Sequence, residues 1–75
     1  MNYEEFLKRI IYLIELIEKE RTGTPQELAN KLHISVSSVY RTIKLLKQCG
    51  LQIEYSRIRG TYYFFESEAS KLIKI

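Results

Sequence analysis

Residues 24–50 constrain the fold of this chain most, because they predict two short helices separated by a tight turn. Thr24 is a good N-cap for the first helix, with Pro25 at the first helical position. Glu27 completes a Thr-x-x-Glu capping box, in which each side chain bonds the other residue's backbone amide. The apolar pattern of this helix stops at Leu32, so the helix is expected to be short.

The turn that follows is predicted at His33. A bend this tight needs a left-handed backbone conformation, which histidine adopts at a cost of roughly 1 kcal/mol. We therefore expect a structural role for His33, because the sequence has no second histidine and no aspartate for a metal or catalytic site. Two short helices joined in this way, with the small Ala29 at their crossing, define a helix-turn-helix.

The second helix of this motif, residues 35–50, has an outward face without a carboxylate. Ser35 can cap its start and Gly50 can end it. At 3.6 residues per turn the apolar side chains share the inward face, namely Val36, Val39, Ile43 and Leu46. The opposite face gathers Ser37, Arg41, Lys44 and Gln48. Small hydroxyls and cations together suit a polyanion with accessible base edges, so we interpret this segment as a DNA recognition helix.

The amino-terminal third predicts an amphipathic scaffold helix, because apolar residues recur there at three- and four-residue steps. The apolar stripe comprises Tyr3, Phe6, Leu7, Ile10, Leu13, Ile14 and Ile17. Tyr12 and Leu16 interrupt the pattern, and we expect them on the outer face. Two interpretations of this pair stay open: isolated apolar surface residues, or a contact for a second subunit or for the chain's own tail.

The segment after the third helix changes to a two-residue periodicity, which predicts strands at 53–56 and 61–65. The residues between them form a hairpin tip, where Gly60 can adopt a positive φ. The side chains expected to cover the core are Ile53, Tyr62 and Phe64. Arg57 and Arg59 at the tip can reach a phosphate or a minor groove. Alternatively, they only keep an edge hairpin soluble.

Charge is distributed unevenly along the chain, although the net charge is only +3. Residues 1–27 carry four cations and six glutamates, whereas residues 28–65 carry six cations and one glutamate. The first part therefore has a net charge of −2 and the second of +5. This local excess of positive charge favours a polyanionic partner, with an ordinary solvated surface as the alternative.

Length and composition predict one domain at 1–65 and a short tail at 66–75, which either packs, forms a dimer contact or frays. No membrane span and no secretory signal are predicted, and the single cysteine, Cys49, cannot form an internal disulfide. We therefore expect a cytoplasmic, nucleoid-associated protein, with Cys49 as a small, partly buried apolar residue. The chain lacks paired carboxylates, a phosphate loop and metal-ligand spacing, so neither an enzyme nor a cofactor or metal site is predicted.

Residues 5–65 resemble the winged helix-turn-helix domain of DeoR-type and biotin-repressor-type bacterial transcriptional regulators. The most similar parts are ELANKLHISVSSVYRTIKLL and GLQIEYSRIRGTYYF. The resemblance implies a mainly α fold of three helices with a small β-hairpin, and operator binding by the third helix. Transferred by position, the implied DNA-binding residues are Ser37 and Ser38 near base edges, Tyr40, Arg41 and Lys44 at the backbone or bases, and Arg57 and Arg59 at the wing tip.

The sequence also departs from this family. Val36 and Ser37 stand where members often carry more polar or basic residues, which implies fewer base-specific contacts. His33 replaces the usual turn glycine. Family members commonly continue into a sensor or catalytic domain, whereas the tail at 66–75 is too short to bind a small-molecule effector, so effector sensing is not predicted.

The predicted mechanism is electrostatic docking on double-stranded DNA followed by reading of the major groove. The phosphate contacts would come from Ser35, Tyr40, Lys44, Arg57 and Arg59, and the base contacts from Ser37, Ser38 and Arg41. A homodimer on half-sites about one helical turn apart is expected, because a single small domain rarely binds an operator strongly. Two alternatives stay open: a protein-interaction module without DNA binding, and binding of single-stranded nucleic acid or RNA through Tyr55, Tyr63 and Phe65 on one strand face.

Overall fold

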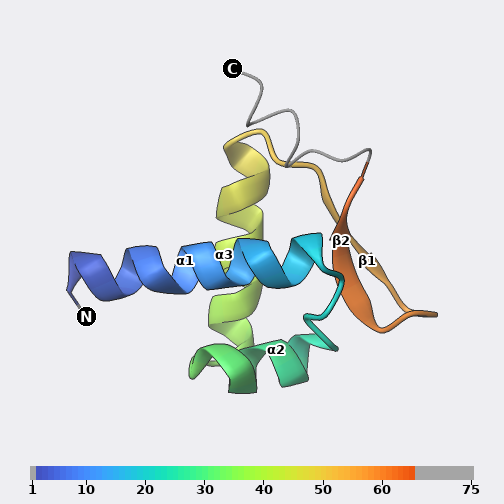
Figure 1. The fold of residues 1–75 in the computed structure, drawn as a ribbon, viewed down its shortest axis with the longest axis horizontal. Coiled ribbons are helices and arrows are strands. Elements are labelled where there is room, and N and C mark those ends of the chain that lie inside the picture. The colour runs from blue at the N-terminus through green and yellow to red at the C-terminus, as the bar shows by residue number, and fades with distance from the viewer. Residues whose placement is uncertain (1, 66–75) are drawn as a thin grey trace.

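The structure, a computed structural model, describes residues 2–65 and consists of three helices followed by a two-stranded hairpin (Figure 1). The elements are α1 (Tyr3–Glu18), α2 (Pro25–Leu32), α3 (Val36–Gln48), β1 (Ile53–Ser56) and β2 (Thr61–Phe64). The predicted mainly α, three-helix winged helix-turn-helix fold is thereby confirmed. The predicted tail at 66–75 lies outside the described residues.

The caps that the sequence predicted define where α2 and α3 begin. The Thr24 hydroxyl accepts a hydrogen bond from the Glu27 amide at 3.2 Å, and the Glu27 carboxylate accepts one from the Thr24 amide at 2.8 Å. These bonds to Thr24, first through its backbone amide, lower the pKa of the Glu27 carboxyl below its usual value. The Ser35 hydroxyl accepts from the Ser38 amide at 3.1 Å and caps α3.

His33 makes the turn between α2 and α3. Its backbone is left-handed, with φ 58° and ψ 43°, as the sequence predicted. The next amide, that of Ile34, then donates to the Ala29 carbonyl at 3.0 Å and closes the end of α2. Ala29 is buried, in agreement with its predicted place at the crossing of the two helices.

One hydrophobic core lies among the three helices and one face of the hairpin. Its buried members are Leu13, Ile17, Leu28, Ala29, Leu32, Val39, Ile43, Leu46, Leu51, Ile53 and Tyr62. Leu16 packs against this core, so its predicted place on the outer face is wrong, whereas Tyr12 is exposed as expected. Cys49 is exposed and not partly buried, because it follows the last turn of α3 at the C-cap, beyond the core contacts.

The hairpin is antiparallel, and Gly60 has the predicted positive φ of 64° at its tip. Ile53 pairs with Phe64 and Tyr55 pairs with Tyr62, so these four residues share one face. That face covers the core as predicted, with Ile53 and Tyr62 buried and Phe64 partly buried. The amide of Phe65, which was predicted to belong to the second strand, donates to the Gln52 carbonyl at 2.9 Å just beyond the end of β2.

No helix in the described part of the chain has both the length and the apolar composition to span a membrane.

Candidate nucleic-acid interface

The polar side of α3 faces away from the rest of the molecule. In Figure 1, α1 crosses in front of α3, and the buried face of α3 shares the core with Leu13 and Ile17 of α1. The side of α3 opposite this core therefore points away from α1. It exposes Ser37, Arg41, Lys44 and Gln48, as the helical periodicity predicted, with Arg41 at the edge that borders α1.

Three side chains form a connected group at the start of α3. The Ser35 hydroxyl donates to the Ser38 hydroxyl at 3.0 Å, and the Arg41 guanidinium donates to the same oxygen at 3.1 Å. Ser35 and Arg41 are exposed, and Ser38 is partly buried. Since the Ser38 oxygen accepts both bonds, its own hydroxyl hydrogen stays available to donate to an acceptor outside the protein.

Tyr40 lies at the junction between α3 and the hairpin. Burial first, and then the neighbouring phenols of Tyr40 and Tyr55, together raise the pKa of the Tyr62 phenol to about 12. Tyr40 is thus close to the inner face of the hairpin, although its side chain is 56% exposed. It can contact a ligand that lies across both α3 and the hairpin.

The wing tip brings Arg57 and Arg59 together, but it gives them different surroundings. Arg57 is exposed, and its guanidinium forms no hydrogen bond or ion pair with the other residues described between 2 and 65. The Arg59 guanidinium instead donates to the Glu20 carboxylate at 2.5 Å and lies 4.8 Å from the centre of the Tyr63 ring. Arg59 is therefore held against the body of the protein by an ion pair and a cation–π contact.

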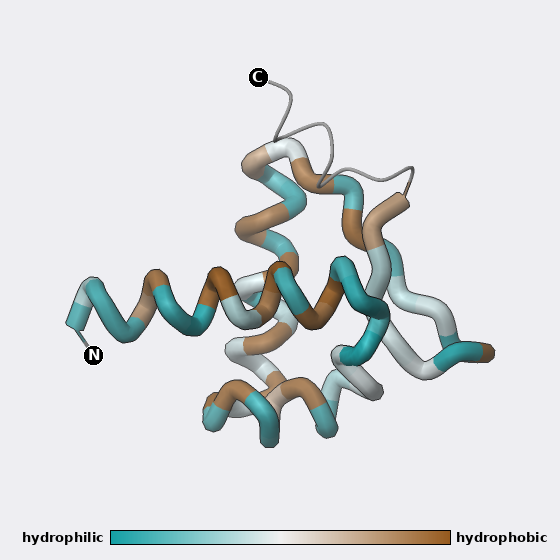
Figure 2. Tube along the Cα trace, in the orientation of Figure 1, coloured by the Kyte–Doolittle hydropathy of each residue, from teal (hydrophilic) through white to brown (hydrophobic). Residues whose placement is uncertain are grey.

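Two residues near this surface were missed by the sequence analysis. Ile58 at the wing tip is 99% exposed, and an apolar side chain between two arginines was the signal that could have found it. Figure 2 shows the apolar end of the hairpin projecting from the body of the protein. Arg9 lines a hollow of about 160 Å³ together with Ser38 and Arg41. A cation on the inner half of an amphipathic helix was the corresponding signal for Arg9.

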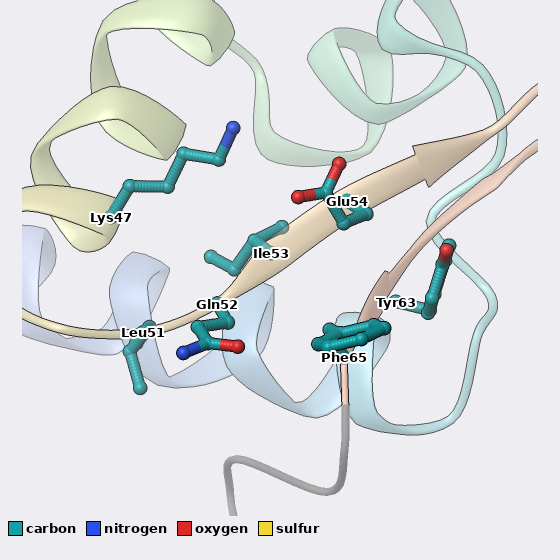
Figure 3. A pocket seen from close by; sticks show the side chains of 7 residues that line it. All are labelled: Lys47, Leu51, Gln52, Ile53, Glu54, Tyr63 and Phe65. Carbon is teal, nitrogen blue, oxygen red and sulfur yellow. The ribbon is translucent and has the colours of Figure 1, made fainter.

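A second hollow, of about 570 Å³, lies on the outer side of the hairpin (Figure 3). Its lining comprises Lys47, Leu51, Gln52, Ile53, Glu54, Tyr63 and Phe65. Tyr55 is absent from this surface, because it pairs with Tyr62 and contacts that ring in a tilted arrangement at a centroid distance of 4.9 Å. The three aromatic residues expected on one strand face for single-strand binding are therefore divided between two faces, and that expectation is wrong.

The residues described between 2 and 65 include no group of three or more His, Cys, Asp or Glu side chains that could hold a metal ion.

Comparison with known proteins identifies the family. The model of a helix-turn-helix (HTH) domain family matches residues 8–63, from α1 to β2. No curated protein and no solved structure matches the chain. Because the match spans most of the sequence, the protein belongs to this family of winged helix-turn-helix, DNA-binding domains, which are typically not enzymes.

Proposed function

We propose that this protein is a cytoplasmic transcriptional regulator that binds specific sequences in double-stranded DNA, with α3 in the major groove and the wing on the backbone or in the adjacent minor groove. The observation that supports this most is the open, polar face of α3, which exposes Arg41 and Lys44 and carries no carboxylate. In this family α3 is the second helix of the helix-turn-helix motif, the one that reads base edges.

Base contacts are proposed for Ser37, Ser38 and Arg41. Arg41 is positioned by its hydrogen bond to Ser38, which holds the guanidinium along α3. Arginine donates to the two acceptors of guanine in the major groove, and the Ser38 hydroxyl hydrogen can serve a neighbouring acceptor. The pair therefore forms a donor-rich patch, and we expect it to favour guanine at the contacted position.

Phosphate contacts are proposed for Ser35, Tyr40, Lys44, Arg57 and Arg59. All five residues are exposed, but Arg59 is also paired with Glu20. A phosphate contact by Arg59 requires exchange of this carboxylate for a DNA phosphate. Because that exchange replaces one ion pair by another, we expect Arg59 to contribute less to affinity than Arg57.

A second copy of the chain is the other proposed partner. A single recognition helix and a short wing bury a small area on DNA, which limits the affinity of one domain. Dimerisation links two such contacts and raises the affinity for DNA that engages both.

Selection from a random pool of duplexes, repeated at two salt concentrations, tests this function. We expect an enriched sequence and a fall of log K with log salt with a slope of roughly −4, for about four to five neutralised phosphates per subunit. The alternative function, a protein-interaction module, predicts no enrichment and no salt-dependent binding to any duplex. That result would overturn the proposal.

A further inference from the structure

The outer side of α1 carries a pattern of charge that is complementary to itself when the helix is reversed. The residues of this outer stripe are Glu4, Lys8, Ile11, Tyr12, Glu15 and Lys19. All six are exposed, with Ile11 at 60% and Tyr12 at 44%. Glu4 and Lys8 form an ion pair of 3.5 Å within the helix, and both side chains remain about three-quarters exposed. No described element lies on the near side of α1 in Figure 1.

An antiparallel second copy of α1 matches this stripe. A two-fold axis midway between the levels of Ile11 and Tyr12 sets Lys8 of one copy opposite Glu15 of the other. The same axis sets Glu4 opposite Lys19, so each charge meets its opposite. Ile11 of each copy meets Tyr12 of the other around the axis, and the two contacts are apolar. A parallel pair in register would instead set every charge against an identical one.

We propose that the outer stripe of α1 is a homodimer interface, and that this dimer bridges two DNA duplexes. A two-fold interface uses the same patch on both subunits, which must therefore be self-complementary, as this stripe is. The inference names the surface of the proposed dimer, and its bridging part rests on the DNA binding proposed for α3.

The bridging follows from where the two surfaces lie. The core lies between α1 and α3, so the outer stripe of α1 and the polar face of α3 point in opposite directions. The molecule measures only 19 Å along its shortest axis, the direction in which α1 lies in front of α3. A two-fold axis within the α1 interface then turns the second α3 to the far side of the dimer. The two recognition helices face apart and contact two separate duplex segments, instead of half-sites one helical turn apart on a single duplex.

Charge reversal tests the interface in the absence of DNA. Lys8→Glu and Glu15→Lys each place like charges opposite one another in a homodimer, and we expect each variant to dimerise on the order of tenfold more weakly than the wild type. A 1:1 mixture of the two variants restores both pairs, so it should sediment as a heterodimer. Residues 8 and 15 lie about 10 Å apart along one helix, so this rescue cannot arise within a single chain. Glu54→Lys, the same change on the hairpin, is the control and should leave dimerisation unchanged.

Three sedimentation results would overturn the interface. They are a wild-type protein that stays monomeric at high micromolar concentration, single variants that dimerise as well as the wild type, and a mixture that fails to recover the dimer. The last result would mean that a different register, a different partner or another surface is used.

Capture of a second duplex tests the bridging. A duplex immobilised on beads should retain a second, fluorescent duplex when wild-type protein is added. Lys8→Glu should still bind a single duplex but lose this capture, and its mixture with Glu15→Lys should regain it. Arg41→Ala should weaken both binding and capture while keeping the dimer. A wild-type dimer that binds one duplex and captures no second one would overturn the back-to-back arrangement. If neither the wild type nor any variant binds a duplex, the proposed DNA binding is wrong, and the bridging is wrong with it. The sedimentation experiments still test whether the outer stripe of α1 is a dimer interface.

Discussion

The hydroxyl oxygens of Thr22 and Thr61 lie 3.0 Å apart in the protein interior and join the loop after α1 to the first residue of β2. The Thr22 hydroxyl also accepts from the Tyr62 amide at 2.8 Å, and the Thr22 amide donates to the Thr61 hydroxyl at 3.2 Å. Both threonines are buried. This pair fixes the angle at which the wing leaves the body of the domain.

Replacement of Thr22 should therefore destabilise the fold and loosen the wing. Thr22→Val keeps the shape of the side chain but leaves the Tyr62 amide without a buried acceptor, which costs about 1–3 kcal/mol. The free energy of unfolding from urea titration measures this loss. Thr22→Ser, which retains the hydroxyl, should recover most of it. Equal stability of the valine variant and the wild type would show that the hydrogen bonds contribute nothing net.

His33→Gly should stabilise the protein by about 0.5–1 kcal/mol. Histidine holds a left-handed conformation at the end of α2, and glycine adopts this conformation without a steric penalty. The imidazole is exposed, so few contacts are lost. Thermal unfolding of His33→Gly beside His33→Val tests this, since the β-branched valine should lower the melting temperature. A stabilising valine would contradict the role assigned to the turn.

The capping box of α2 should make stability depend on pH. The pKa of the Glu27 carboxyl is lowered in the folded protein, so ionised Glu27 favours the folded state above the ordinary pKa of glutamate. This contribution disappears as the pH falls through the lowered pKa. Glu27→Gln keeps a side chain able to form the box but removes the charge, so it should be less stable than the wild type at neutral pH. Urea titrations should show the difference closing in acid, and a constant difference would exclude the ionised carboxylate as its source.

Arg41→Ala should weaken binding to the selected duplex by about 1–3 kcal/mol and relax the preference at one base position. Lys44→Ala should weaken binding to all duplexes alike and reduce the salt slope by about 1. Fluorescence anisotropy at several salt concentrations separates these two effects. Arg21→Ala, which removes an exposed cation from the loop after α1, is the control and should change neither. Unchanged affinity of Arg41→Ala would remove this residue from the site.

Glu20→Gln should strengthen DNA binding a few-fold at low salt. The Glu20 carboxylate is the partner of the Arg59 guanidinium, and its neutral replacement releases that cation for a phosphate. The salt slope should steepen by about 1, because one more phosphate is neutralised. The effect should vanish in Glu20→Gln/Arg59→Ala. Weaker binding of Glu20→Gln alone would show that the ion pair serves to hold the wing in its binding position.

The sequence alone determined the local features of this protein. The capping box at Thr24, the left-handed turn at His33 and the N-cap at Ser35 all depend on residues three or four positions apart, whose chemistry selects one backbone conformation. The polar face of α3 follows from helical periodicity in the same way. The family-level fold was therefore predictable from the order of these elements.

Only the tertiary structure decided which distant residues meet. The partners of Thr22 and of Arg59 lie 39 positions away in the chain, and no spacing rule pairs such residues. Leu16 packs on the core because neighbouring elements reach further around α1 than its apolar stripe indicates. The strand register, not composition, separates Tyr55 from Tyr63, since alternate residues of a strand point to opposite faces. Which surfaces lie side by side depends on how the helices cross, and that is determined by the packing of the whole core.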